Sequence, residues 1–126
     1  GLRLYGNAII VNTEFASANS DKIKAFIKAV GEGWKDAIAN PDKAVAALVK
    51  RNPAADRNLE KRRLSLAIEA NVLTDYVQKN GMGNIDQSRF QAAIEQMRET
   101  YQYKNMPKAE LYFTDSYLPK GGIKIN

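Results

Sequence analysis

The stretch that decides the fold is LYGNAIIVNTEF, at residues 4–15. It holds an unbroken apolar run, AIIV at residues 8–11, between two asparagines. Most of this run is β-branched, and no polar residue interrupts it, which is typical of a strand covered on both faces. We therefore predict a strand over residues 4–12, and the fold depends on what covers it.

The sequence beyond this stretch is mostly helical in pattern. Apolar residues recur at helical spacing between residues 23 and 38 and form one stripe. Asn40 and Pro41 end that helix and start the next, because proline fits a first helical turn. We expect three more helices, from Asp56 or Asn58, over about residues 74–79, and after a cap at Asp86. The predicted fold class is mostly α, with about five helices and one N-terminal strand.

The predicted strand has few partners within this chain. A lone strand cannot satisfy its own backbone N–H and C=O groups. Only residues 111–113 and 123–125 could pair with it, and both are short. We therefore expect its neighbours to lie in a larger protein or in a second copy of the chain. Gly31 and Gly33, inside the first long helix, are expected to mark close packing of another backbone, since glycine is costly there.

Composition excludes several classes of function. The chain has 126 residues, one domain's worth, and contains neither Cys nor His. This rules out a disulfide, a thiolate nucleophile and a His-based metal or acid–base site within it, and we expect no cofactor. Its 19 basic and 14 acidic residues are mixed along the chain, which favours a solvated surface over nucleic-acid binding. No apolar stretch approaches the roughly 20 residues of a membrane span.

Four stretches in order, LYGNAIIVNTEF, GEGWKDAIANPDKAV, RNPAADRNLEKRRLSLAIEANVLT and NGMGNID, carry a resemblance. Together they resemble the C-terminal part of periplasmic substrate-binding proteins that serve nitrate, sulfonate, taurine and thiamine-pyrimidine ABC importers. The resemblance implies a type II periplasmic binding protein, an α/β fold of two lobes with the ligand between them. Residues 1–15 would be a crossover strand, residues 16–119 a helical part packing on the first lobe, and residues 120–126 a tail.

The resemblance also implies a function. The chain would be the C-terminal fragment of a non-enzymatic solute-binding component, capturing a small organic or anionic solute by lobe closure. Its partners would be the solute, the membrane permease and the missing N-terminal lobe, and its location the periplasm. Two alternatives stay open. One is a fragment of a thiamine-pyrimidine synthase-like enzyme, whose His and Cys would lie outside this chain. The other is a helical interaction domain that self-associates as a strand-swapped homodimer.

Tyr5, Gly6 and Asn7 are the candidate ligand-binding residues. The resemblance places them near the hinge, where a hydroxyl and amides can orient a small polar ligand. The alternative is a purely structural entry into the strand, with Gly6 setting the backbone and Asn7 making a local hydrogen bond. We predict no catalytic residue and no metal ligand.

Other residues favour structural roles. Trp34 lies in the helical stripe and is expected to pack in the core rather than stack on a ligand. The basic triplet at residues 61–63 could bind an anion, but neighbouring glutamates favour a solvated face. Residues 81–83 favour a helix C-cap and turn over a phosphate loop. Asp75 and Asp86 suit helix caps better than acid–base chemistry.

Overall fold

The structure is a computed structural model that describes residues 4–105, 108 and 111–125. The described residues form helices and no strand, which confirms a mostly helical chain. The elements are α1 (Thr13–Ala18), α2 (Ser20–Ala39), α3 (Pro41–Arg51), α4 (Arg57–Ala67), the π-helix η1 (Ile68–Val72), α5 (Asp75–Asn80) and α6 (Gln87–Tyr101).

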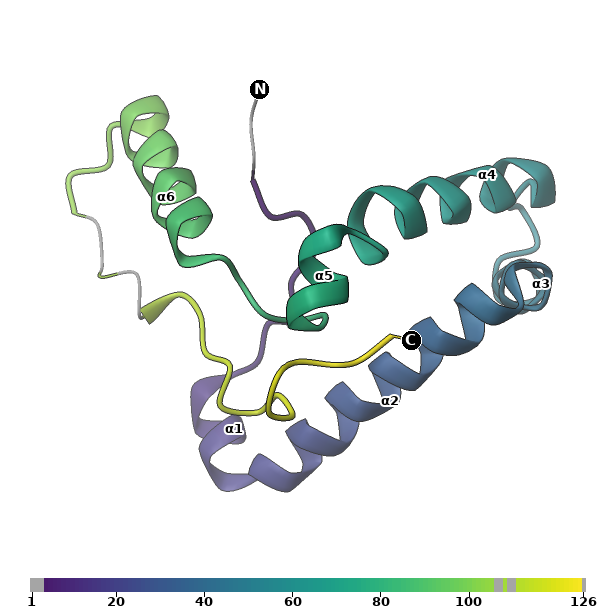
Figure 1. Ribbon diagram of the computed structural model, residues 1–126, viewed down its shortest axis with the longest axis horizontal. Helices are drawn as coiled ribbons and strands as arrows, with labels where there is room; N and C mark the ends of the chain where they lie inside the picture. The colour runs from purple at the N-terminus through teal and green to yellow at the C-terminus, as the bar shows by residue number, and fades with distance from the viewer. Residues whose placement is uncertain (1–3, 106–107, 109–110, 126) are drawn as a thin grey trace.

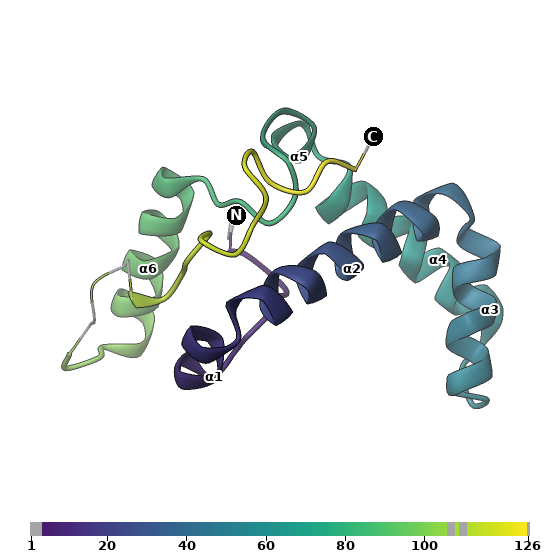
Figure 2. The ribbon, with the colours of Figure 1, turned by 90° about the horizontal axis from the view of Figure 1, so that it is seen from below.

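Helix α2 is the long diagonal helix along the lower side of an open arrangement (Figure 1). Helices α3 and α4 pack against each other at one end of α2, and α1 lies at the other. Helix α6 lies far from α3 in both views (Figures 1 and 2). An exposed ion pair joins the two packed helices, with Lys61 Nζ 2.8 Å from Asp42 Oδ1. The buried Val45, 2% exposed, lies on α3.

Two predicted helix caps are confirmed. Asp56 Oδ1 accepts the Leu59 N–H at 2.7 Å, and Asp86 Oδ1 accepts the Arg89 N–H at 2.8 Å. Each carboxylate satisfies a donor that has no partner within its own helix. The prediction for Asp75 is wrong: it is the first residue of α5, whose cap is the preceding threonine.

The predicted strand over residues 4–12 is wrong for this chain. That segment is an uncoiled trace in Figure 1, and no backbone–backbone hydrogen bond joins residues 5–11 to another described segment. Ile9 is 54% exposed and Ile10 is 93% exposed. Asn12 instead caps α1, accepting the Phe15 N–H at 2.9 Å. A strand needs a neighbour to receive its hydrogen bonds, and the described chain supplies none.

The small apolar core lies where the C-terminal tail crosses α1 and α2. Its buried residues are Ala16, Ile23, Ile27 and Ile123. Met82 and Ile123 form an antiparallel bridge, with N–H to O distances of 2.8 and 2.9 Å. Residues 123–125 were a candidate partner for the N-terminal segment, but the tail pairs with the loop after α5 instead.

The glycines of α2 differ in their surroundings. A Cβ at Gly31 would lie 2.5 Å from Ile123 Cγ2, whereas one at Gly33 would meet nothing within 4 Å. Gly31 is therefore closely packed, but against the side chain of Ile123 rather than the predicted backbone, and the prediction is wrong at Gly33. The tail also approaches Gly81, which has a φ of 81°: a Cβ there would lie 2.9 Å from the Gly122 Cα. Only glycine fits both demands at that position.

The chain exposes far more surface than its mass requires. Its accessible surface is 9930 Å² for a mass of 14.0 kDa. A compact monomer of that mass exposes about 6,700 Å², which leaves an excess of about 3,200 Å². Large apolar side chains contribute to it from most elements, among them Ile10, Phe15, Phe26, Leu66 and Leu111.

Candidate functional site

Tyr5 is held at the start of α6. The Asp86 N–H donates to the Tyr5 hydroxyl oxygen at 2.7 Å. The Arg89 guanidinium lies over the Tyr5 ring, 4.3 Å from its centroid, and the ring meets Phe90 edge to face with centroids 6.4 Å apart. The side chain of Tyr5 thus uses both its polar tip and its ring, the two kinds of contact that a partly buried tyrosine makes.

Further contacts extend this cluster. Arg89 also donates to the backbone oxygen of Leu4 at 2.7 Å, so two consecutive residues of the N-terminal segment are fixed by one side chain. On the other side, Phe90 meets Phe113 edge to face at 6.3 Å. The cluster therefore joins the N-terminal segment, α6 and the chain beyond residue 111.

The electrostatics of the cluster follow from its hydrogen bonds. The Ser88 hydroxyl and the Arg89 N–H both donate to the Asp86 carboxylate and hold its pKa below the usual value, so it is ionised at neutral pH. Burial raises the pKa of the Tyr76 phenol, and the nearby Tyr5 and Asp86 raise it further. Tyr76 is therefore a neutral hydroxyl beside an ionised carboxylate.

Gly6 and Asn7 are placed differently from Tyr5. Both are exposed, and a Cβ at Gly6 would meet nothing within 4 Å. The structure brings Tyr5 together with α6 but leaves its two neighbours open to solvent. The local hydrogen bond considered for Asn7 does not occur among the described residues, whereas Asn12 makes such a bond. A ligand-binding role for Tyr5, Gly6 and Asn7 stays a prediction.

The other candidates have structural roles. In the basic triplet at residues 61–63, Arg63 donates to Glu60 at 2.7 Å and Lys61 to Asp42, while Arg62 is exposed. Lys61 also holds the pKa of the Asp42 carboxyl below its usual value, through its hydrogen bond and its charge. The triplet is thus a solvated, partly ion-paired face, as predicted. Gly81 is the C-cap of α5, also as predicted.

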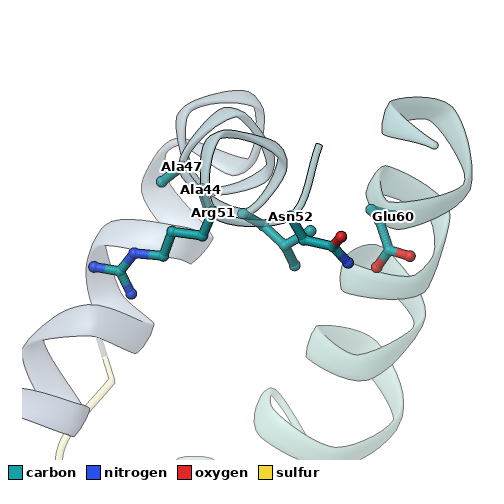
Figure 3. A pocket seen from close by; sticks show the side chains of 6 residues that line it. Ala44, Ala47, Arg51, Asn52 and Glu60 are labelled. Atoms are coloured by element: carbon teal, nitrogen blue, oxygen red, sulfur yellow. The ribbon is translucent and has the colours of Figure 1, made fainter. Parts of the chain in front are cut away.

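Two hollows lie away from Tyr5. A groove of about 530 Å³ lies between α3 and α4, and Figure 3 shows Glu60 of α4 facing the end of α3 across it. It is lined by Ala44, Ala47, Leu48, Arg51, Asn52 and Glu60. A second hollow of about 230 Å³ includes Ile38, Val77 and Ile125 in its lining. Neither hollow includes a predicted ligand-binding residue.

The described part of the chain contains neither a carboxylate cluster for a metal ion nor a membrane-spanning helix. Its acidic residues nowhere gather in a group of three that could hold a metal ion. None of its helices combines the length and the hydropathy needed to cross a bilayer.

A family model described as "NMT1/THI5 like" matches residues 1–44. The matched part contains the N-terminal segment, α1, α2 and the first turn of α3, and therefore Tyr5, Gly6 and Asn7. The match supports a substrate-binding role for this region of the chain. Comparison with curated proteins and with solved structures found no match to the chain.

Sequence reasoning identified Tyr5 and the cap at Asp86 but missed their contact. It also missed Arg89, which directly precedes Phe90 on α6. The signal available in the sequence was an arginine directly before an aromatic residue on one helix, because an arginine can stack on a tyrosine ring.

Proposed function

We propose that this chain is part of the solute-binding component of an ABC importer in the periplasm. The single observation that carries the proposal is the match of residues 1–44 to the NMT1/THI5-like family model. The component would capture a small organic or anionic solute by closing two lobes and would present the closed form to a membrane permease. No bond is made or broken in this mechanism.

The exposed surface supports a missing lobe. The excess of about 3,200 Å² over a compact monomer exceeds the roughly 800 Å² that each partner buries in a standard interface. An N-terminal lobe would cover part of it, including Ile9 and Ile10, which are 54% and 93% exposed. We propose that this lobe completes a type II periplasmic binding protein fold of which the chain is the C-terminal part.

In this account Tyr5, Gly6 and Asn7 line the solute site. Gly6 lets a ligand approach its backbone closely, because it has no side chain and even an added Cβ there would meet nothing within 4 Å. The exposed Asn7 amide offers both a donor and an acceptor. Enclosure between lobes, with a few such polar groups, gives affinity and orientation for a small solute.

The proposal is tested by adding the missing part. The chain is co-expressed with the N-terminal lobe of an NMT1/THI5-like protein, and the product is titrated calorimetrically with nitrate, taurine and the thiamine pyrimidine. We expect a one-to-one complex by light scattering and binding of one of these solutes. Binding should weaken at least tenfold in Asn7→Ala, whereas Asn71→Ala, an exposed control in η1, should bind normally.

Three other results would contradict the proposal. A homodimer that excludes the added lobe, and that Ile10→Lys dissociates, would favour the strand-swapped alternative. Turnover of a pyridoxal-type substrate would favour the synthase-like alternative, with its acid–base groups supplied by the added lobe. A one-to-one complex that binds none of the three solutes would also count against the proposal.

A further inference from the structure

We propose that Asp86 and Arg89, at the start of α6, are positioning residues that anchor Tyr5 and thereby orient Gly6 and Asn7. The anchoring is a property of this chain by itself. Its importance for solute binding rests on the proposed function, which assigns those three residues to the site.

The contacts fix the segment at two points. The hydroxyl of Tyr5 accepts the Asp86 N–H at 2.7 Å, and the backbone oxygen of Leu4 accepts from Arg89 at 2.7 Å. Arg89 also covers the Tyr5 ring at 4.3 Å. One point is a side-chain tip and the other is the adjacent backbone, so together they set both the position and the direction of the chain as it enters Gly6.

The other end of the segment is fixed as well. Val11 packs against the core, and Asn12 caps α1. Residues 6–10 therefore span two anchors that lie on different helices. A shift of α6 relative to α1 would move one anchor and turn Gly6 and Asn7, which couples the proposed site to the placement of α6.

The contacts of Arg89 orient the N-terminal segment rather than raise the global stability of the chain. Arg89 is exposed, so its hydrogen bond to Leu4 and its contact with the Tyr5 ring contribute little to global stability. Its planar guanidinium, however, can bind a backbone oxygen and stack on a ring together, which a lysine ammonium cannot do. The expected signature of Arg89 is a loss of local order without a matching loss of global stability.

The test uses nuclear magnetic resonance on the 126-residue chain without solute. The heteronuclear NOE of the Gly6 and Asn7 amides reports their order on the fast timescale. In Arg89→Ala we expect both values to fall by at least a third, while the urea unfolding midpoint stays within error of that of Arg98→Ala. Arg98 is the matched control, since it also lies on α6 and its guanidinium pairs, among the described residues, with Glu95. Arg89→Lys should restore the order only in part.

A second variant keeps the proposal testable if Arg89→Ala unfolds. Tyr5→Phe keeps the ring and removes the acceptor for the Asp86 N–H. Exchange of that amide should become about fivefold faster, the factor expected for the loss of one hydrogen bond. Unchanged exchange in Tyr5→Phe would overturn the proposal. So would an equal response of Gly6 and Asn7 to Arg89→Ala and Arg98→Ala.

The two proposals can fail separately. If Arg89→Ala loosens Gly6 and Asn7 and Tyr5→Phe speeds exchange of the Asp86 amide, the anchoring is supported even when the completed protein binds no solute. That second result contradicts the proposed function alone. If solute binds but Arg89→Ala and Tyr5→Phe change neither readout, the anchoring is wrong and the proposed function stands.

Discussion

The N-terminal segment and the C-terminal tail are both non-helical and rich in isoleucine, yet they end in opposite environments. Ile123 of the tail is 9% exposed and bridges to Met82, whereas Ile10 of the N-terminal segment is 93% exposed. The tail docks because Gly81 and Gly122 let two backbones approach closely. No described segment offers the residues around Ile10 such a surface, so composition alone does not determine burial.

The largest expected effect is a difference in the free energy of unfolding between alanine substitutions at two isoleucines. Ile123→Ala should lower the free energy of unfolding by about 2–3 kcal/mol, because it removes methyl groups from the small core over α2. Ile10→Ala should change it by less than about 0.5 kcal/mol, since that side chain is already in water. Urea unfolding followed by circular dichroism measures both. Equal losses would show that the N-terminal segment is as well covered as the tail.

The two glycines of α2 should respond to alanine substitution with stability changes of opposite sign. Gly33→Ala should stabilise the chain by about 0.5–1 kcal/mol, because alanine is the better helix former and nothing lies nearby. Gly31→Ala should instead destabilise it by about 1–2 kcal/mol, since the new methyl group meets Ile123. Thermal unfolding of both variants checks the signs. Stabilisation by both would mean that the tail does not lie on α2.

The smallest expected effect is on the pH dependence of the stability of the chain. The folded-state pKa values of Asp42 and Asp86 lie below their usual value, so the unfolded chain binds these protons more readily. Their contribution is present above the usual value of 3.8 and is lost as the pH falls through the lowered pKa values. Asp86→Asn should flatten this loss while keeping a cap residue. An unfolding midpoint that rises on acidification would contradict this sign.

The sequence predicted α2 to α6 and the caps at Asp56 and Asp86, because periodicity and capping are local, but it placed the cap of α5 at Asp75 instead of Thr74. It failed at residues 12–15, which it assigned to the crossover strand. In the structure Asn12 caps α1 there. The apolar run at residues 8–11 predicts a buried strand, but burial depends on a neighbouring segment that local sequence does not reveal. The contact of Tyr5 with Asp86 joins residues 81 positions apart, beyond the reach of any periodicity argument.

The claim on which the others depend is that the backbone of residues 8–11 has no hydrogen-bonding partner among the described residues and needs one from outside the chain. Amide hydrogen exchange on the dilute chain tests it most directly, with the amides of α2 as the internal reference. We expect exchange at residues 8–11 near the rate of an unstructured peptide, and protection only when the N-terminal lobe is added. Protection at 8–11 as strong as that in α2, in a sample shown by light scattering to be monomeric, would contradict it.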